Sequence, residues 1–164
     1  MNARTRHIAV VALTFAVNYG LDRLTKLLAT AYLQGKRGFS FLYDTVVLRY
    51  AENSGAFLSM GSRWPDWLKY AVLLVLPTLL CLYGLYYCLF KERDLWKTIF
   101  LVSALAGGLG NLIDRSFNDF MVVDFLNFGI GRLRTGVLNV ADLSITFGFL
   151  AYLIREWALR PRED

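Results

Sequence analysis

The chain has 164 residues, of which 56% are hydrophobic and 15% aromatic, and its mean hydropathy is +0.42. This composition is more apolar than that of ordinary soluble domains, and it predicts a protein that crosses a membrane several times. The net charge of +5 is consistent with contact with lipid headgroups. The sequence has no basic stripe with interleaved aromatic residues, so we expect no nucleic-acid partner.

The first apolar run extends from about residue 8 to residue 33 after a short basic head. It is too long for the core of a cleaved signal peptide, so we interpret it as a permanent membrane span. Near its far end, Asp22 and Lys26 are four residues apart, a spacing that places them on one helix face as an ion pair. A structural role suits this pair at least as well as a catalytic one.

Two polar segments, residues 34–66 and 116–136, interrupt the apolar runs. The first is rich in β-branched and aromatic residues from Thr45 to Tyr50, and its Phe39 and Phe41 alternate with small or polar residues. We therefore expect a small sheet on the membrane surface. The second contains Val122-Val123-Asp124-Phe125, where an acid has apolar neighbours on both sides. Asp124 therefore lies either on a short strand or at the membrane surface.

A second span is expected at about residues 67–90, with a helix start at Trp64-Pro65-Asp66-Trp67. Pro77 lies inside this span and predicts a kink. A third span is expected at about residues 96–113. The small residues Gly107 to Gly110 at its end would let another helix approach closely.

A fourth span, residues 140–157, begins at the stretch Asn139-Val140-Ala141-Asp142. On a helix, Asn139 and Asp142 would share one face. A carboxylate in an apolar run normally faces a bundle interior or a wet cavity, so Asp142 is a functional candidate. We therefore expect one domain over residues 1–164, a helical membrane fold of four transmembrane helices with a small extracytoplasmic sheet.

Three acids, Asp22, Asp114 and Asp142, are expected at a similar depth on three different helices. Each lies roughly 20 to 26 Å along its helix from the nearest basic residue at the opposite end, at about 1.5 Å per residue. Because the hydrocarbon layer is about 30 Å thick, all three reach one level near one membrane face. Independent salt bridges would have no reason to share that level. Depth alone nominates Asp114 or Asp22 as the partner of Asp142.

Basic residues in the chain ends and in the turn at residues 91–97 occupy short segments, which marks that side as cytoplasmic. Both termini then lie in the cytoplasm. The polar segments 34–66 and 116–136 lie outside, and the acids lie near the outer face.

The residue inventory excludes several chemistries. The one histidine, His7, is at the wrong end of the bundle for a Ser/His/Asp triad or a zinc site. Cys81 and Cys88 are away from the acids, so thiol catalysis is not expected and both are interpreted as structural. A Ser/Lys dyad with Lys26 stays open, its serine being Ser54, Ser59 or Ser144. The remaining chemistry is a pair of carboxylates that share a proton, one holding it while the other activates water.

Five motifs resemble, in order and spacing, those of bacterial lipoprotein signal peptidase, also called signal peptidase II. They are Asp22-Arg23-Leu24-Thr25-Lys26, Asn53-Ser54-Gly55-Ala56, Gly107-Gly108-Leu109-Gly110-Asn111-Leu112-Ile113-Asp114-Arg115, Val122-Val123-Asp124-Phe125 and Asn139-Val140-Ala141-Asp142. Two positions depart from the family pattern: Phe57 follows the second motif directly, and Leu138 replaces a usual Phe. Both are apolar changes that concern substrate fit rather than the chemistry.

The resemblance implies an aspartyl endopeptidase of the bacterial cytoplasmic (inner) membrane that cuts prolipoproteins before a diacylglyceryl-modified cysteine. Asp124 and Asp142 match the catalytic pair. Residues that match positions shaping the site or holding the substrate are Asn53, Gly55, Gly108, Asn111, Arg115, Asn139 and Ala141, with support from Asp22, Lys26 and Asp114. The resemblance also implies sensitivity to the cyclic peptide globomycin. We expect no metal or cofactor, membrane lipid as a partner, and a monomer.

Two other classes of function stay open at this point. A small four-helix proton-coupled transporter could relay protons through Asp22, Asp114 and Asp142. The sequence shows no repeat between its halves, which counts against this alternative. A non-catalytic assembly subunit held by polar helix contacts would leave Asp124 unexplained.

Overall fold

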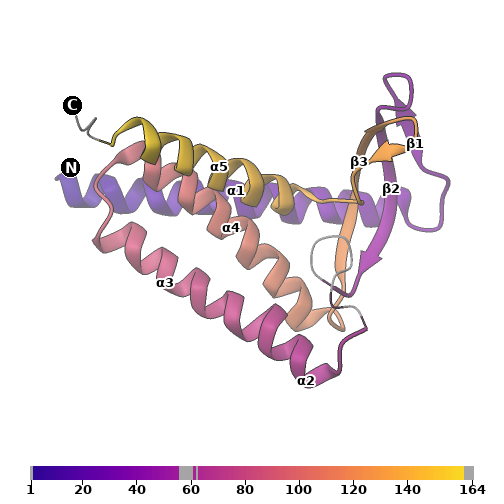
Figure 1. The fold of residues 1–164 in the computed structure, drawn as a ribbon, viewed down its shortest axis with the longest axis horizontal. Helices are drawn as coiled ribbons and strands as arrows, with labels where there is room; N and C mark the ends of the chain where they lie inside the picture. The colour runs from indigo at the N-terminus through magenta and orange to yellow at the C-terminus, as the bar shows by residue number, and fades with distance from the viewer. Residues whose placement is uncertain (1, 56–60, 62, 161–164) are drawn as a thin grey trace.

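A computed structural model describes residues 2–55, 61 and 63–160. Long helices dominate it, and a small sheet lies at one end of the helix bundle (Figure 1). The helical segments are α1 (Ala3–Leu33), α2 (Asp66–Lys69), the π-helix η2 (Tyr70–Val75), α3 (Leu76–Phe90), α4 (Leu95–Phe117) and α5 (Val140–Ala158). The amino terminus, the carboxyl-terminal end of α5 and the α3–α4 turn all lie at the end opposite the sheet (Figure 1).

Side-chain caps explain where three of these helices begin. The side chains of Asn2 and Asp94 accept hydrogen bonds from backbone N–H groups three residues later, at the starts of α1 and α4. Asn139 does the same at the start of α5. Each cap satisfies one of the N–H groups that a helix leaves unpaired in its first turn.

The segment from Asp66 to Phe90 is irregular at the place where Pro77 predicts a kink. The chain runs from α2 through the π-helix η2 into α3, and Pro77 occupies the first turn of α3. Proline cannot donate to a carbonyl four residues back, and its ring clashes with that carbonyl. The wider π-helical turns stand directly before this proline, and such bulges commonly accompany helix kinks.

Three helical stretches, Ala3–Leu33, Asp66–Phe90 and Leu95–Phe117, are long and apolar enough to cross a membrane. The helix α5 is shorter and carries Asp142 and charged residues near its end, and among the described helices it does not meet this measure. It packs along α4, and most of its large apolar side chains are exposed. The predicted class, a helical membrane protein with a small antiparallel sheet, is confirmed.

The helix α4 continues to Phe117, four residues beyond the expected end of the third span. Asp114 and Arg115 therefore occupy its last turns, so Asp114 lies on a helix as expected. Asp114 is buried. The helix continues because Asp114 and the residues around it find partners inside the protein rather than in water.

The sheet consists of β1 (Phe39–Phe41), β2 (Val46–Asn53), β3 (Val122–Ile130) and β4 (Leu133–Arg134), antiparallel and in that order. Both polar segments of the sequence thus contribute to one sheet. Asp124 lies on β3, opposite Ala51 of β2. Of the two alternatives for this acid, the strand is therefore correct.

Small residues bring α4 and α5 into close contact, as the sequence predicts. A Cβ on Gly107 would lie 2.4 Å from the carbonyl oxygen of Ala141, and one on Gly148 would lie 2.6 Å from the carbonyl oxygen of Phe100. Neither backbone approach would be possible with a side chain. This packing sets the start of α5 directly against α4.

Candidate active site

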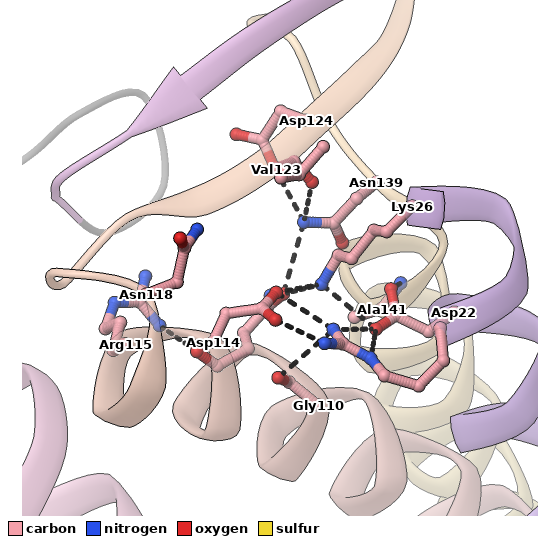
Figure 2. A network of polar contacts seen from close by, with 12 residues as sticks. Asp22, Lys26, Gly110, Asp114, Arg115, Asn118, Val123, Asp124, Asn139 and Ala141 are labelled. Atoms are coloured by element: carbon pink, nitrogen blue, oxygen red, sulfur yellow. Dashed lines mark hydrogen bonds and ion pairs between the residues drawn. The ribbon is translucent and has the colours of Figure 1, made fainter. Parts of the chain in front are cut away.

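Two of the predicted acids are neutralised by cations from α1. Lys26 Nζ lies 3.0 Å from Asp22 Oδ2 and 2.7 Å from Asp114 Oδ2. The guanidinium of Arg23 binds the same two carboxylates, with Arg23 Nη2 at 2.7 Å from Asp22 Oδ2 and 2.9 Å from Asp114 Oδ2. Figure 2 shows Asp22, Lys26 and Asp114 of this cluster side by side. Each buried carboxylate is paired, which offsets its cost of desolvation.

Asp22 also holds the start of α5 in place. It is fully buried, and its Oδ1 accepts a hydrogen bond of 3.0 Å from the backbone N–H of Ala141. Gly110 leaves room for this carboxylate, since a Cβ there would lie 2.9 Å from Asp22 Oδ2. The acid on α1 thus supplies a negative charge to the positive end of the α5 dipole.

Asn111 connects the neutralised cluster to Asp142. Its Oδ1 accepts from Lys26 Nζ at 2.8 Å, and its Nδ2 donates to Asp142 Oδ1 at 2.9 Å. Asn139 Nδ2 also donates to Asn111 Oδ1, at 3.1 Å. The orientation of the Asn111 amide is fixed because both of its ends are used.

Asn139 joins the two acids on α5 and β3. It is the N-cap of α5, and together with Asp142 it forms a capping box, in which each side chain accepts from the backbone N–H of the other. Its Nδ2 also donates to Asp124 Oδ1 at 2.6 Å (Figure 2). Asn53, at the end of β2, donates to the other oxygen of Asp124 at 3.1 Å. Asn139 precedes the helix, so the expectation that it shares a helical face with Asp142 is replaced by a direct contact.

Asp124 is almost completely buried, with 2% of its surface exposed. Burial, together with the negative charge of Asp142, raises its pKa from 3.8 to about 6. The hydrogen bonds from Asn53 and Asn139 work against this rise because they favour the ionised form. The carboxyl of Asp124 can therefore hold a proton at a pH where an exposed aspartate would be ionised.

A cavity of about 250 Å³ adjoins Asp142 between α3, α4 and α5. Apolar side chains make up much of its wall, and Gly108 leaves it open, since a Cβ there would approach Cys81 Sγ to 3.2 Å. Its lining residues are Leu73, Pro77, Cys81, Gly108, Asn111, Leu112, Arg115, Asp142, Ile145 and Thr146. A ligand in this cavity would contact both an apolar wall and a carboxylate.

Arg115 brings a cation to the same cavity. Its Nη2 donates to the carbonyl oxygen of Gly55 at 2.7 Å, which ties α4 to the turn after β2. Its Nε is buried and finds no hydrogen-bond partner among the described residues. Such a donor is available to a ligand that supplies a carbonyl oxygen.

All twelve predicted site residues lie in or beside this network, but they divide into two groups. Asp22, Lys26 and Asp114 form the neutralised cluster, and Asp124 with Asp142 lies beyond it. Asn139 thus connects Asp142 to Asp124, whereas depth alone nominates Asp114 or Asp22. The other predicted site residues surround these two groups: Asn53, Gly55, Gly108, Asn111, Arg115, Asn139 and Ala141.

Arg23 is the functional residue that sequence reasoning missed. It follows Asp22 directly and was given no role, yet it contacts both acids of the neutralised cluster. The signal in the sequence was a cation directly next to an acid inside an apolar run. Of the two departures from the family pattern, Phe57 lies outside the described residues, as does Ala56. Leu138 contacts β3 through its backbone, exchanging two hydrogen bonds of 2.7 Å with Leu126.

The two alternatives that use these residues differently gain no support from the contacts. Asp22 and Asp114 are each held by two cations, which leaves them poorly suited to relay protons in a transporter. Lys26 is bound by two carboxylates and by Asn111, so it has no free base for a Ser/Lys dyad. Ser59 lies outside the described residues, and Ser144 donates to Asn18.

Apolar helices with a paired-carboxylate site at one end, beneath a small sheet, define a multi-pass membrane protein with a hydrolase-like site. Residues 14–158 match the family described as Signal peptidase (SPase) II. The chain belongs to this family, as its motifs predict.

Individual relatives agree with this assignment. The chain is 33% identical over 148 residues to a lipoprotein signal peptidase of Borreliella burgdorferi (strain ATCC 35210), with 86% of this chain and 85% of the relative covered. It is 34% identical over 138 residues to a lipoprotein signal peptidase of Borrelia turicatae, with 81% of each covered. A solved structure described as a bacterial membrane enzyme superposes with a TM-score of 0.78 over 96% of this chain and 94% of the other. Its sequence identity is 20%, so it supports the fold alone.

Proposed function

We propose that this chain is an intramembrane aspartic endopeptidase that removes signal peptides from prolipoproteins before a diacylglyceryl-modified cysteine. Membership of the signal peptidase II family supports the substrate class. The aspartic mechanism is supported by one observation. Asp124 and Asp142 are bridged by Asn139 and have no ion pair among the described residues, whereas Asp22 and Asp114 are neutralised.

The reaction needs one ionised and one protonated carboxyl. The ionised member of the pair accepts a proton from water as the water oxygen attacks the scissile carbonyl carbon. The protonated member donates to the carbonyl oxygen, which yields a neutral tetrahedral diol. Collapse of the diol breaks the C–N bond: a diol hydroxyl gives its proton to the ionised carboxylate, while the amine nitrogen takes up the proton held by the other carboxyl. The pair again carries one proton, as at the start.

The surroundings of the pair suit a backbone substrate with a lipid-modified side chain. The apolar wall of the adjoining cavity suits the apolar part, and the free Nε of Arg115 suits a backbone carbonyl. Asn53 and Gly55 fix the carboxyl group of Asp124 on the side of the sheet. Asn53 donates to this carboxyl, and the backbone N–H of Gly55 donates to the side-chain oxygen of Asn53 at 3.0 Å. These contacts orient the peptide bond relative to both acids.

The proposal includes a location. We place the protein as a monomer in the bacterial cytoplasmic membrane, surrounded by lipid, with the site near the outer face. The sheet and the first turn of α5, which contains Asp142, lie at the end of the bundle opposite the first turn of α1 (Figure 1). A substrate that arrives with its lipid anchor in the outer leaflet would meet the site at its own depth.

Cleavage of a lipidated precursor peptide by the purified protein in lipid vesicles tests the mechanism. Asp124→Asn and Asp142→Asn should each lower the rate by at least about 100-fold, because neither acid alone can both activate water and donate a proton. Thermal unfolding in detergent should show that both variants stay folded. Full activity in either variant would refute the pair.

Asp22→Asn is the matched control, since it changes a buried acid of the same network. It should lower the thermal midpoint by removing a partner of Lys26 and of the Ala141 N–H, while measurable cleavage remains. A complete loss of cleavage in folded Asp22→Asn would show that the division between the two groups of acids is wrong.

A further inference from the structure

A second cavity, which we call the basal cavity, lies at the end of the bundle opposite the sheet. It has a volume of about 590 Å³ and is lined by Ala3, Arg4, His7, Leu89, Phe90 and Arg93. The first turns of α1 and the last turn of α3 form its walls, near the termini in Figure 1. The proposed peptidase reaction uses none of these residues.

The basic side chains of this cavity have no acidic partners. Among the described residues, neither Arg4 nor Arg93 forms an ion pair or a side-chain hydrogen bond, and both are exposed. Two other cations at this end of the bundle are paired, Lys97 with Glu156 and Arg155 with Asp94. The two arginines thus leave a local positive charge open to an external anion.

The acid nearest in sequence, Glu92, forms no ion pair with either arginine in the described part of the chain. Glu92 is 8% exposed, and its Oε1 accepts from the backbone N–H groups of Arg93 and Asp94, each at 2.8 Å. Its other oxygen accepts from the hydroxyl of Tyr87 at 3.3 Å. Glu92 is therefore occupied in closing the α3–α4 turn and does not line the cavity.

His7 holds the two walls of the cavity together. Its Nε2 donates to the carbonyl oxygen of Cys88 at 2.7 Å, so the first turns of α1 are tied to the carboxyl end of α3. A helix leaves its last carbonyl groups unpaired, and this contact satisfies one of them. The fold therefore holds the chain segments that carry Arg4 and Arg93 next to each other.

The other part of the lining is apolar. Leu89 and Phe90 belong to the last turn of a helix that is long and apolar enough to cross a membrane, and Phe90 is 51% exposed. At such a helix end, apolar side chains face acyl chains and basic side chains face headgroups. Basic pockets between transmembrane helices suit acidic phospholipid headgroups.

We infer that the basal cavity binds an anionic phospholipid, with its phosphate between Arg4 and Arg93 and its acyl chains against Leu89 and Phe90. Guanidinium groups match phosphate oxygens through paired hydrogen bonds. A zwitterionic phospholipid carries its own cation beside the phosphate, so the unpaired arginines favour a headgroup with net negative charge.

Native mass spectrometry of the full chain in neutral detergent tests this inference. The protein is mixed with equimolar phosphatidylglycerol and phosphatidylcholine, and retained lipid is counted. The wild type should retain phosphatidylglycerol preferentially, and Arg4→Gln/Arg93→Gln should lower that retention by on the order of 10-fold. Equal retention of the two lipids by the wild type would overturn the inference.

The matched control is Arg6→Gln/Lys91→Gln. It removes the same charge from the same two chain segments, but neither residue lines the cavity, so retention should stay at the wild-type level. An equal loss in both double variants would show that general surface charge, not a site, binds the lipid. Inorganic phosphate distinguishes the two possible ligands. If millimolar phosphate displaced the lipid and raised the thermal midpoint of the protein as much as the lipid does, the cavity would be a site for free phosphate, and the lipid assignment would be overturned.

Folding of the variants is checked independently. Arg4→Lys/Arg93→Lys keeps both charges and should retain phosphatidylglycerol more strongly than the glutamine pair. Cleavage of precursor peptide in detergent should be unchanged in every one of these variants, because the cavity lies at the far end of the bundle from the carboxylate pair. If the lysine pair loses lipid as fully as the glutamine pair while remaining active, the charge-based site is wrong.

Discussion

The side-chain oxygen and nitrogen of Asn139 have different roles that substitution can separate. Asn139 caps α5 with its Oδ1 and donates to Asp124 with its Nδ2. Asn139→Ser keeps a capping oxygen but loses the amide donor, so stability should be nearly unchanged while cleavage falls. Asn139→Ala loses both contacts and should also cost about 1 kcal/mol of stability. Thermal unfolding and cleavage rates of the two variants, measured side by side, check this separation.

The two variants would contradict this account if they behaved alike. Equal losses of stability would mean that the cap is not what Asn139 contributes. Equal, wild-type cleavage would mean that its contact with Asp124 does not prepare the site.

The raised pKa of Asp124 predicts how activity depends on pH. The working form of the pair carries one shared proton, so cleavage should be lost at low pH, where both acids are protonated, and at high pH, where neither is. Since the pKa of Asp124 is raised to about 6, the alkaline limb should begin near neutral pH. The pH profile of kcat/KM measures this, and a value of kcat/KM that does not change between pH 5 and pH 9 would contradict it.

Stability should follow the same group with a defined sign. The folded state raises the pKa of Asp124 from 3.8 to about 6, so protonation favours the folded state by at most about 3 kcal/mol. This contribution is fully present below about pH 4 and is lost as the pH rises through about 6. The thermal midpoint of the wild type should therefore fall between pH 5 and pH 8 more than that of Asp124→Asn.

At the scale of elements, the contact between α4 and α5 decides where the start of α5 lies. Gly107→Ala would place a Cβ 2.4 Å from the carbonyl oxygen of Ala141, so the helices must separate. Overpacking of this kind costs about 1–3 kcal/mol. Because the same approach sets Asp142 against Asn111 of α4, cleavage should fall as well. Thermal unfolding and cleavage assays of the variant measure both effects.

Gly20→Ala is the control for this substitution. Gly20 is also a helical glycine, but a Cβ there would meet no atom within 4 Å. The same chemical change should leave stability equal or slightly higher, since alanine favours helix over glycine. Equal destabilisation by both substitutions would show that the close approach of α4 and α5 is not responsible.

The arrangement of the elements also explains why two acids form ion pairs with cations and the other two do not. α1 delivers Arg23 and Lys26 to the end of α4, where Asp114 lies, and both cations reach Asp22 as well. β3 and α5 bring Asp124 and Asp142 to the other side of Asn111 and supply amides instead of cations. The charge state of each acid thus follows from the element that faces it.

The whole molecule predicts a definite topology. The first turn of α1, the carboxyl-terminal end of α5 and the α3–α4 turn lie at one end of the bundle, and the sheet lies at the other (Figure 1). Reporters that are active only outside the cytoplasm should be active when fused within residues 34–66 or 116–136. They should be inactive in the turn at residues 91–97 and after residue 160. Reporter fusions at these positions in whole cells provide the measurement.

The carboxyl-terminal fusion is the most informative of these. Among the described helices, α5 alone of the long ones does not meet the length and composition measure for a span. A reporter after residue 160 that is active outside would show that α5 does not cross the membrane. Activity at residues 91–97 would invert the arrangement.

Local sequence was sufficient for the elements and for the family. Long apolar runs have one stable solution in lipid, a helix, and alternating β-branched residues suited the sheet. The predicted ion pair of Asp22 and Lys26 and the close approach at Gly107 are confirmed, because both depend on spacing within one helix or on the size of one residue. The motifs predicted the signal peptidase II family correctly.

The choice of partner for Asp142 was decided by tertiary structure. Distance along a helix places Asp22, Asp114 and Asp142 at one depth but contains no information on which side chains face one another across the bundle. Asp124 lies on a strand, for which helical depth has no meaning, and it reaches Asp142 because β3 passes the start of α5. Which acids are neutralised likewise depends on the rotation of α1 against α4. The sequence therefore predicted that carboxylates gather at one level of the membrane. Only the packing of three helices and a strand decided that Asp22 and Asp114 meet cations while Asp124 and Asp142 meet amides.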